Sequence, residues 1–467
     1  MSSETTQNIV DLDRKHFLHP FHSFDTITEE GALPIAKAEG AYIWDTDGNK
    51  YLDAVGGMWC NNVGAGRKDM AEAIYEQVLK CSYSNNFVDM TNDTVVKLCA
   101  KLAELAPGNL NHTFLTCGGS TANDTAYRIV QMYNNIRGKQ DKKAIITRKD
   151  SYHGTTLLTM SLGGKAGDRC SELDYLDEGA NAIHSYKVSS PNHYRYGKGM
   201  TEMEYGLYLY EEFVDKVAEL GGPDKVAAFL AEPITGAGGV APPPANYIRQ
   251  VWEYCKANDI LYWSDEVVTG FGRCGEWFVS ESIYGIQPDI IVSAKGLSSA
   301  YIPMGACIFS DEIWDTLSEH GAGRVFLNGF TYSGHAVGAA AALKNIEIIE
   351  RENILDHVKE VGSYFMEQLQ TLRDLEMVGD VRGSHFMACL EFVKDSTTNE
   401  TFPEELDIGK RVSNEADEMG LIVRPIVNLN IMSPALTLTK EECDVIVSTL
   451  RKAIIKAGDK LKAENLW

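Results

Sequence analysis

Between about residues 95 and 310, short apolar runs alternate with helical patterns. Two segments have the 3.6-residue period of amphipathic helices, NDTAYRIVQMYNNI (123–136) and YIRQVWEYCKAND (247–259). We expect strands in five runs: HTFLTCGG (112–119), KAIITRK (143–149), KVAAFLAEPI (225–234), ILYWSDEVV (260–268) and DIIVSAK (289–295). This alternation predicts an α/β fold, with a mostly parallel sheet covered by helices on both faces.

This alternation of short strands and helices ends at about residue 333. The stretch 333–375 predicts one or two long helices, and strand-like runs then alternate with helical ones up to a last helix from about Lys440. Near the other end, AYIWDTDGNKYLDAV (41–55) resembles a hairpin, but the first 70 residues are too few for a core of their own. We therefore expect three parts: an N-terminal segment (1–70) that packs on the small domain, a large domain (71–334) and a C-terminal small α+β domain (335–467).

Charge and cysteine content exclude several classes of protein. The 467 residues include 66 acidic and 43 basic side chains, for a net charge of -23, which disfavours nucleic acids and anionic membranes as partners. The 10 cysteines form no CxxC pair, as expected of reduced thiols. The N-terminus lacks the apolar core of a leader, and no run approaches the roughly 18 apolar residues of a membrane span. We therefore expect a cytoplasmic protein.

Polar, glycine-linked and aromatic residues follow the predicted strands. Because ligands of open α/β sheets bind beyond the carboxyl ends of the strands, these residues predict a pocket. They are Cys117 to Thr121, Tyr152 to Gly154, Glu232 and Pro233, Asp265 and Glu266, and Lys295 and Gly296. The run CGGSTAND (117–124) ends a strand and opens a helix, so its backbone N–H groups could bind a phosphate; a simple turn is the alternative. It contains neither GxGxxG nor GxxxxGK[ST], so a dinucleotide fold or a P-loop is poorly supported.

Lys295 and Asp265 are the two residues that indicate which reaction this pocket could support. Each alone has an ordinary explanation, a solvated lysine at a strand end and a helix-capping or ion-paired aspartate. Together with a phosphate turn and the aromatic Tyr152, they match the needs of pyridoxal 5'-phosphate. A buried lysine of lowered pKa can form a Schiff base with its aldehyde, and a carboxylate can keep its pyridine nitrogen protonated.

At this point the chain resembles a known family, the class III, fold-type I aminotransferases, and within it the ω-amino acid or amine:pyruvate transaminases. The likeness extends from LDRKHFLHPFHSF (12–24) to the last helix and is carried by SDEVVTGFGRCGEWF (264–278), AKGLSS (294–299) and GFTYSGH (329–335). The resemblance implies a large domain with a mostly parallel seven-stranded sheet, and a smaller α+β domain built from both termini.

The resemblance also implies a role for individual residues. Lys295 would be the Schiff-base lysine and Asp265 the partner of the pyridinium nitrogen. The other cofactor-binding residues would be Gly119 and Ser120 at the phosphate, Tyr152 and Val267 on the two faces of the ring, Glu232, and Thr331, which would reach the phosphate of a second subunit in a homodimer or tetramer. The residues that would line the substrate pocket are Phe21, Trp59 and Arg424.

The sequence departs from the family pattern in two places. The phosphate turn carries Gly118 and Thr121 where many relatives have serine and glutamate, which changes its side chains but need not change its backbone donors. Ala237 stands where relatives that use 2-oxoglutarate have a glutamate, which favours pyruvate as the acceptor. The histidines His16, His19, His22, His153 and His335 are scattered without HExxH or a comparable pair, so we regard them as structural or pocket-lining and expect no metal.

The expected activity is a ping-pong transfer of an amino group from an amine or ω-amino acid donor to pyruvate or a similar keto acid. Alternatives within the fold are a diamine or diaminopelargonate-type aminotransferase, an aminomutase and a dialkylglycine-type decarboxylase. A non-catalytic regulator that binds the same cofactor is a further alternative, but it would need a basic nucleic-acid-binding head, and the residues before Asp45 leave no room for one.

Overall fold

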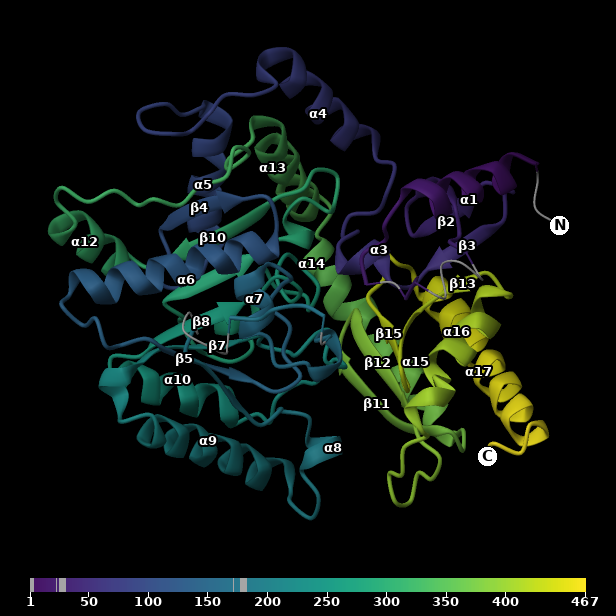
Figure 1. Ribbon diagram of the computed structural model, residues 1–467. Coiled ribbons are helices and arrows are strands. Elements are labelled where there is room, and N and C mark those ends of the chain that lie inside the picture. Colours follow the sequence, from purple (N-terminus) through teal and green to yellow (C-terminus); the bar gives the residue numbers. More distant parts are fainter. Residues whose placement is uncertain (1–3, 22, 25–30, 171, 177–182) are drawn as a thin grey trace.

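The computed structural model describes residues 4–21, 23–24, 31–170, 172–176 and 183–467. Its largest sheet has seven strands in the order β4-β10-β9-β8-β7-β5-β6 (Figure 1). Neighbouring strands run parallel except at β10, which is antiparallel to both of its neighbours. The predicted seven-stranded α/β fold is therefore confirmed. The strands are β4 (His112–Thr116), β5 (Ala144–Arg148), β6 (Ser185–Val188), β7 (Val226–Ala231), β8 (Leu261–Asp265), β9 (Ile290–Ser293) and β10 (Gly305–Phe309).

Alternate residues of these strands pack on opposite faces of the sheet, as the two-residue period of a strand requires. On one face, Leu230 and Trp263 pack with side chains of α6, whereas Phe229 and Tyr262 pack on the other face with α9 and α10. The helices of this part are α4 (Lys68–Cys81), α5 (Asp93–Leu105), α6 (Gly119–Ile136), α7 (Leu157–Leu162), α8 (His193–Tyr196), α9 (Glu202–Glu219), α10 (Tyr247–Ala257), α11 (Val279–Ser282) and α12 (Asp311–His320).

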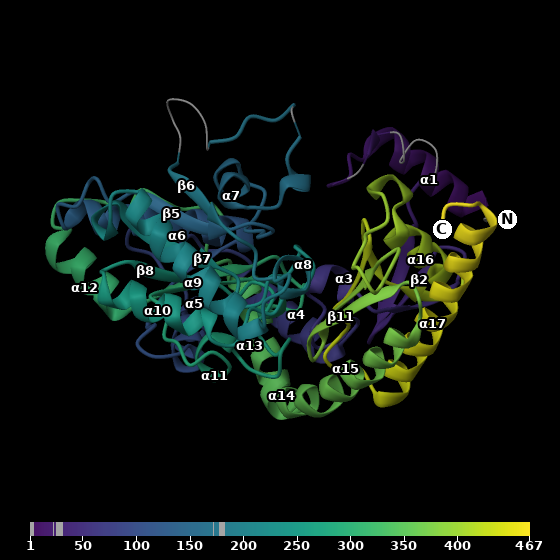
Figure 2. The same cartoon turned by 90° about the horizontal axis from the view of Figure 1, so that it is seen from below.

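Two four-stranded sheets form the rest of the molecule, in the orders β1-β2-β3-β13 and β11-β12-β15-β14. In the first, β3 from the N-terminal region pairs in parallel with β13 from the C-terminal region. Both termini accordingly lie on the side of the molecule formed by these sheets (Figures 1 and 2). Their strands are β1 (Ile35–Glu39), β2 (Tyr42–Asp45), β3 (Lys50–Asp53), β11 (Val378–Ser384), β12 (Met387–Phe392), β13 (Leu421–Ile422), β14 (Arg424–Ile426) and β15 (Leu429–Met432).

The stretch after residue 333, predicted to form one or two long helices, is divided into two helical segments at residues 352 and 353. Helix α13 ends at Arg351. Asn353, the residue before α14, has a left-handed backbone with φ 51°, which separates the two helices. The helices outside the large sheet are α1 (Glu4–His16), α3 (Gly56–Trp59), α13 (Ala336–Arg351), α14 (Ile354–His357), a π-helical turn (Val358–Gly362), α15 (Ser363–Gln370), α16 (Ile408–Asp417) and α17 (Lys440–Ala463). The domain limits at residues 70 and 334 stay a prediction. Within the described residues, no helix is long and apolar enough to span a bilayer.

Candidate active site

The parallel strands of the large sheet end at one edge, and the predicted site residues follow these ends. Strand β8 ends at Asp265 itself, and β9 ends two residues before Lys295. Glu232 comes directly after β7, and Tyr152 follows β5 by four residues. The strand-end rule therefore brings residues from four segments of the sequence to one place.

Asp265 is the most firmly held side chain at this edge. Its Oδ2 accepts a hydrogen bond from Asn123 Nδ2 at 2.9 Å and lies 2.8 Å from His153 Nδ1, while Oδ1 accepts from the backbone N–H of Val267 at 3.2 Å. Asn123 also donates to the His153 carbonyl at 2.8 Å. Because the carboxylate is only 4% exposed, these contacts fix its plane and direction.

Sequence reasoning missed Asn123 and gave His153 no role at Asp265. Asn123 lies in CGGSTAND, four residues after Gly119, and residues four apart share one face of a helix. This spacing could have placed Asn123 beside the phosphate turn. The contact between His153 and Asp265 spans 112 residues, and no local pattern predicts it.

Lys295 lies in the turn after β9, and its backbone is left-handed with φ 46°. Burial lowers the pKa of its amine, and the nearby carboxylate of Asp265 opposes this shift. The Nζ atom lies 6.0 Å from the centre of the Trp59 ring. A lysine of lowered pKa holds a larger share of free amine, the form that attacks an aldehyde.

Gly119 opens α6 at the place where the sequence predicts a phosphate site. A Cβ atom added there would lie 3.0 Å from Cγ2 of Val267, so a larger residue would require Val267 to shift slightly. Within the described chain, no side chain caps this helix, whose first N–H groups can therefore serve an anion. Ser120 Oγ accepts from the backbone N–H of Thr155 at 3.1 Å and joins the turn to the loop of Tyr152.

Glu232 positions Tyr152 through the backbone. Its Oε1 accepts from the N–H of Tyr152 at 3.0 Å, and its Oε2 accepts from the N–H of Gly236 at 2.8 Å. Burial raises the pKa of the Glu232 carboxyl. The ring of Tyr152 lies edge-on to the exposed ring of Phe21, with 6.5 Å between their centres.

Arg424 starts β14 and is half-buried beside the same group of residues. Its guanidinium donates to the sulfur of Met58, next to Trp59 in the chain. Burial lowers the pKa of Arg424, and the nearby Tyr152 and Asp168 oppose this shift. Ten of the eleven predicted site residues are thus connected by contacts or by close electrostatic influence.

Thr331 is the exception. It is exposed, and its carbonyl accepts a hydrogen bond from the Tyr83 hydroxyl at 2.8 Å. Across the described residues, no contact joins Thr331 to Lys295, Asp265 or Gly119 of the same chain.

The sequence model of the family "Aminotransferase class-III" matches residues 26–454. The chain is 41% identical to putrescine–pyruvate aminotransferase of Pseudomonas aeruginosa over 95% of each protein. Among solved structures, an (S)-enantioselective omega-transaminase from Thermomicrobium roseum superposes with a TM-score of 0.92 at 35% identity, covering 97% of this chain and 98% of that one. The omega transaminase of Pseudomonas jessenii in complex with PMP gives 0.92 at 32% identity over 99% of each chain.

The chain therefore belongs to the class III aminotransferases of fold-type I. It is an aminotransferase, and its cofactor is pyridoxal 5'-phosphate. The residues described above fit this group, because they offer an amine of lowered pKa for the aldehyde, a fixed carboxylate for the ring nitrogen and a glycine turn at a helix N-terminus for the phosphate.

Proposed function

We propose that this enzyme transfers the amino group of an amine or ω-amino acid to pyruvate or a similar keto acid. The observation that carries the proposal is that Asp265 and Arg424 both lie close enough to Lys295 to shift the pKa of its buried amine, Asp265 raising it and Arg424 lowering it. The relative from Pseudomonas aeruginosa, whose name includes pyruvate, supports the acceptor, as does Ala237 in place of an acidic residue.

Each residue has a part in the proposed reaction. When bound, pyridoxal 5'-phosphate supplies an electron sink that stabilises negative charge on the substrate carbon. Lys295 holds the cofactor and afterwards moves the proton at that carbon, while Asp265 keeps the ring nitrogen charged. The remaining cofactor contacts are made by Gly119, Ser120, Tyr152, Val267 and Glu232. Phe21, Trp59 and Arg424 bind the substrates.

Arg424 gives the site its affinity for a keto acid. A guanidinium binds a carboxylate through two parallel N–H···O bonds, and its contact with the Met58 sulfur is weak enough to be exchanged for a carboxylate. An amine without a carboxylate would leave this cation unpaired, so we expect the long side chain to swing away when such a donor binds.

A diamine is the donor class that a specific observation favours. Burial raises the pKa of the Tyr152 hydroxyl, and Asp168 lies close enough to raise it further. Its carboxylate pairs with Lys165 at 2.6 Å, and a distal ammonium could replace this partner. The name of the Pseudomonas aeruginosa relative includes the diamine putrescine.

We also propose a homodimer, or a tetramer built from such dimers, in the cytoplasm. Strongly exposed apolar side chains, among them Val88 and Leu327, surround a cavity of about 770 Å³ close to Thr331 in the chain. A second copy that covers this face would bury them and bring its Thr331 to the neighbouring site. All ten cysteines, each within the described residues, are free thiols, which supports a reducing compartment.

The direct test is alanine formation from pyruvate with a panel of donors, comparing wild type with Arg424→Ala and Asp168→Asn. We expect Arg424→Ala to raise KM for pyruvate by about tenfold to a hundredfold, the loss of a charge-assisted bond, and to change KM for an arylalkyl amine little. Asp168→Asn should raise KM for putrescine only. Equal losses for every substrate would contradict these roles, and the absence of alanine with all donors would contradict the function.

A further inference from the structure

The turn that carries Lys295 has an unusual backbone. Three of its residues are left-handed although none is glycine: Lys295 with φ 46°, Ser299 with φ 47° and Ala300 with φ 61°. Side chains with a Cβ atom disfavour this region, so such a turn persists only where its surroundings hold it.

One buried side chain of α13 spans this turn. The Nδ2 atom of Asn345 donates to the carbonyl of Gly296 at 2.8 Å and to that of Leu297 at 3.1 Å. Its Oδ1 accepts from the hydroxyl of Ser299 at 2.6 Å, and that hydroxyl accepts from the N–H of Val63 at 3.2 Å. A single amide, fully shielded from solvent, therefore binds the two residues after Lys295 and the next left-handed residue.

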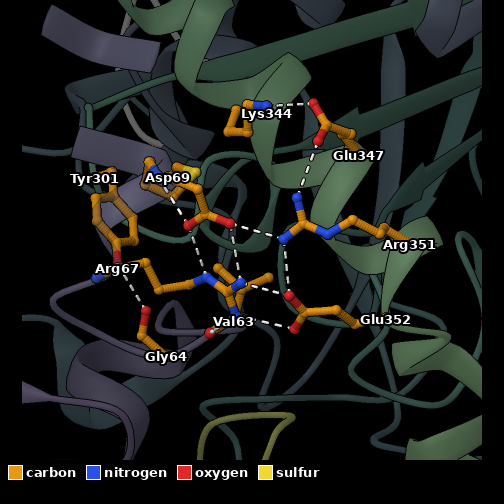
Figure 3. Close-up of polar contacts among 10 residues, drawn as sticks. Val63, Gly64, Arg67, Asp69, Tyr301, Lys344, Glu347, Arg351 and Glu352 are labelled. Atoms are coloured by element: carbon orange, nitrogen blue, oxygen red, sulfur yellow. Dashed lines mark hydrogen bonds and ion pairs between the residues drawn. The ribbon is translucent and has the colours of Figure 1, made fainter. Parts of the chain in front are cut away.

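The far end of the turn is tied to the same helix. The Tyr301 hydroxyl donates to the Gly64 carbonyl at 2.8 Å and accepts from the N–H of Arg67 at 2.9 Å. Figure 3 shows the guanidinium of Arg67 between Asp69 and Glu352, and Glu352 directly follows α13. Asn345 and this ion-pair cluster thus hold the turn against α13 at two points.

The backbone of the turn is also closely packed at Gly296. A Cβ atom at Gly296 would lie 2.3 Å from Nδ2 of Asn62, which itself donates to the carbonyl of Phe271 at 2.7 Å. A second buried amide, that of Asn62, therefore packs closely against the backbone next to Lys295.

We propose that Asn345 is a positioning residue, which fixes the backbone turn of Lys295 and so aims its amine for proton transfer. This inference rests on the proposed role of Lys295. Within the described residues, the side chain of Asn345 makes no hydrogen bond to the Lys295 amine or to the Asp265 carboxylate, so it acts through the backbone.

The chain offers a closely matched control. Asn430 in β15 is equally shielded, and its Nδ2 donates to two backbone carbonyls, Gly409 at 2.8 Å and Leu429 at 3.1 Å. We compare Asn345→Leu with Asn430→Leu in the holoenzyme. Each variant loses two hydrogen bonds from an amide to backbone carbonyls, and Asn345→Leu also loses the bond from Ser299 to Oδ1, so both should lower Tm, with Asn345→Leu lowering it somewhat more.

Only Asn345→Leu should change the chemistry. We expect it to lower kcat by about tenfold or more with KM for pyruvate within about twofold, as a misaimed group would. It should also shift the midpoint of the pH titration of the bound cofactor's visible absorbance by more than about half a pH unit, since the environment of the Lys295 amine changes. Equal effects of both variants on kcat and on the midpoint, or no effect of either, would overturn the proposal.

Two further variants test the proposal if Asn345→Leu does not fold and separate it from the proposed function. If Asn345→Leu does not fold, Ser299→Ala, which removes the contacts of this hydroxyl with Asn345 Oδ1 and with the N–H of Val63, should lower kcat about threefold or more, and an unchanged kcat overturns the proposal. Lys295→Ala separates this inference from the function. If Lys295→Ala still forms alanine, the proposed function fails, whereas an inactive Lys295→Ala beside a fully active Asn345→Leu overturns only the role of Asn345.

Discussion

Asp265 receives three hydrogen bonds, and two of the groups that contact it, on Asn123 and His153, are 142 and 112 residues away in the sequence. The sequence alone predicts the carboxylate, because it ends an apolar strand one strand away from Lys295. It cannot predict the groups that orient it, since those depend on how α6 and the loop after β5 pack. Individual reactive residues are thus easier to predict than the neighbours that hold them.

We predict that Asp265→Asn retains the cofactor but slows the single-turnover reaction with an amine by about a hundredfold or more, because the ring nitrogen loses its negative partner. Stopped-flow absorbance measures this step. Asp289→Asn is the control, since Asp289 is also 4% exposed but lies before β9, at the other end of the strand. A normal single-turnover rate in Asp265→Asn would refute the role of Asp265.

Asp417 makes stability depend on pH in a predictable direction. It is the last residue of α16, its Oδ1 is buried without a hydrogen-bond partner among the described residues, and burial raises its pKa from 3.8 to about 7. Between these values the folded state keeps a proton that the unfolded state has lost, so this group lowers the free energy of unfolding as pH rises from about 4 to 7.

Asp417→Asn should remove this effect. We expect equal free energies of unfolding for variant and wild type near pH 4 and a gain of roughly 1–2 kcal/mol at pH 8, reduced from the full effect of the shift because the carboxylate is partly exposed. Urea unfolding at the two pH values measures the difference. If Asp417→Asn raised the free energy of unfolding equally at pH 4 and pH 8, ionisation of Asp417 would not be the cause of the wild type's loss of stability.

At the scale of elements, five of the seven strands of the large sheet and the helices α6, α10 and α17 follow from apolar periodicity. Strand β6 reads Ser-Tyr-Lys-Val and is too short and polar to be recognised. Strand β10 reads Gly-Ala-Cys-Ile-Phe and was not among the predicted strands. The joining of distant elements could not be predicted, as the contacts of α13 with the turn of Lys295 illustrate. Such contacts depend on packing rather than on a local pattern.

The start of α6 offers a test at this scale. Gly119→Ala would place Cβ 3.0 Å from the side chain of Val267, so Val267 or the start of α6 must shift by a few tenths of an ångström. We expect the affinity of the apoenzyme for pyridoxal 5'-phosphate to fall by about tenfold or more. Because the clash is with Val267, adding Val267→Ala should restore part of the affinity. Purely additive losses in a titration followed by fluorescence would contradict this explanation.

At the scale of the whole molecule, the chain leaves Thr331 outside its own site and exposes apolar side chains near it. Leu327 is 86% exposed beside the large apolar cavity. Burial of such a surface by a second copy, as we propose, would account for both features, and the shared site is a prediction from the family resemblance rather than from periodicity.

We therefore predict that Leu327→Asp yields monomers that have lost most transaminase activity, because a buried unpaired carboxylate opposes association. Size-exclusion chromatography with light scattering measures the mass. Val445→Asp is the control, since Val445 is 51% exposed on α17, far in sequence from the cavity, and should leave mass and activity unchanged. A dimeric and active Leu327→Asp would contradict the proposed interface.

The central claim is that Lys295 is the amine on which transamination depends, and Lys295→Ala tests it most directly. The variant should fold and still bind the cofactor, because we expect the helix N-terminus at Gly119 to hold the phosphate independently of the lysine. Alanine formation from pyruvate and a saturating amine, measured with the loaded variant, is predicted to fall below about a hundredth of the wild-type rate, as expected when a general acid–base group is lost. A variant that keeps more than this fraction of the rate would contradict the account.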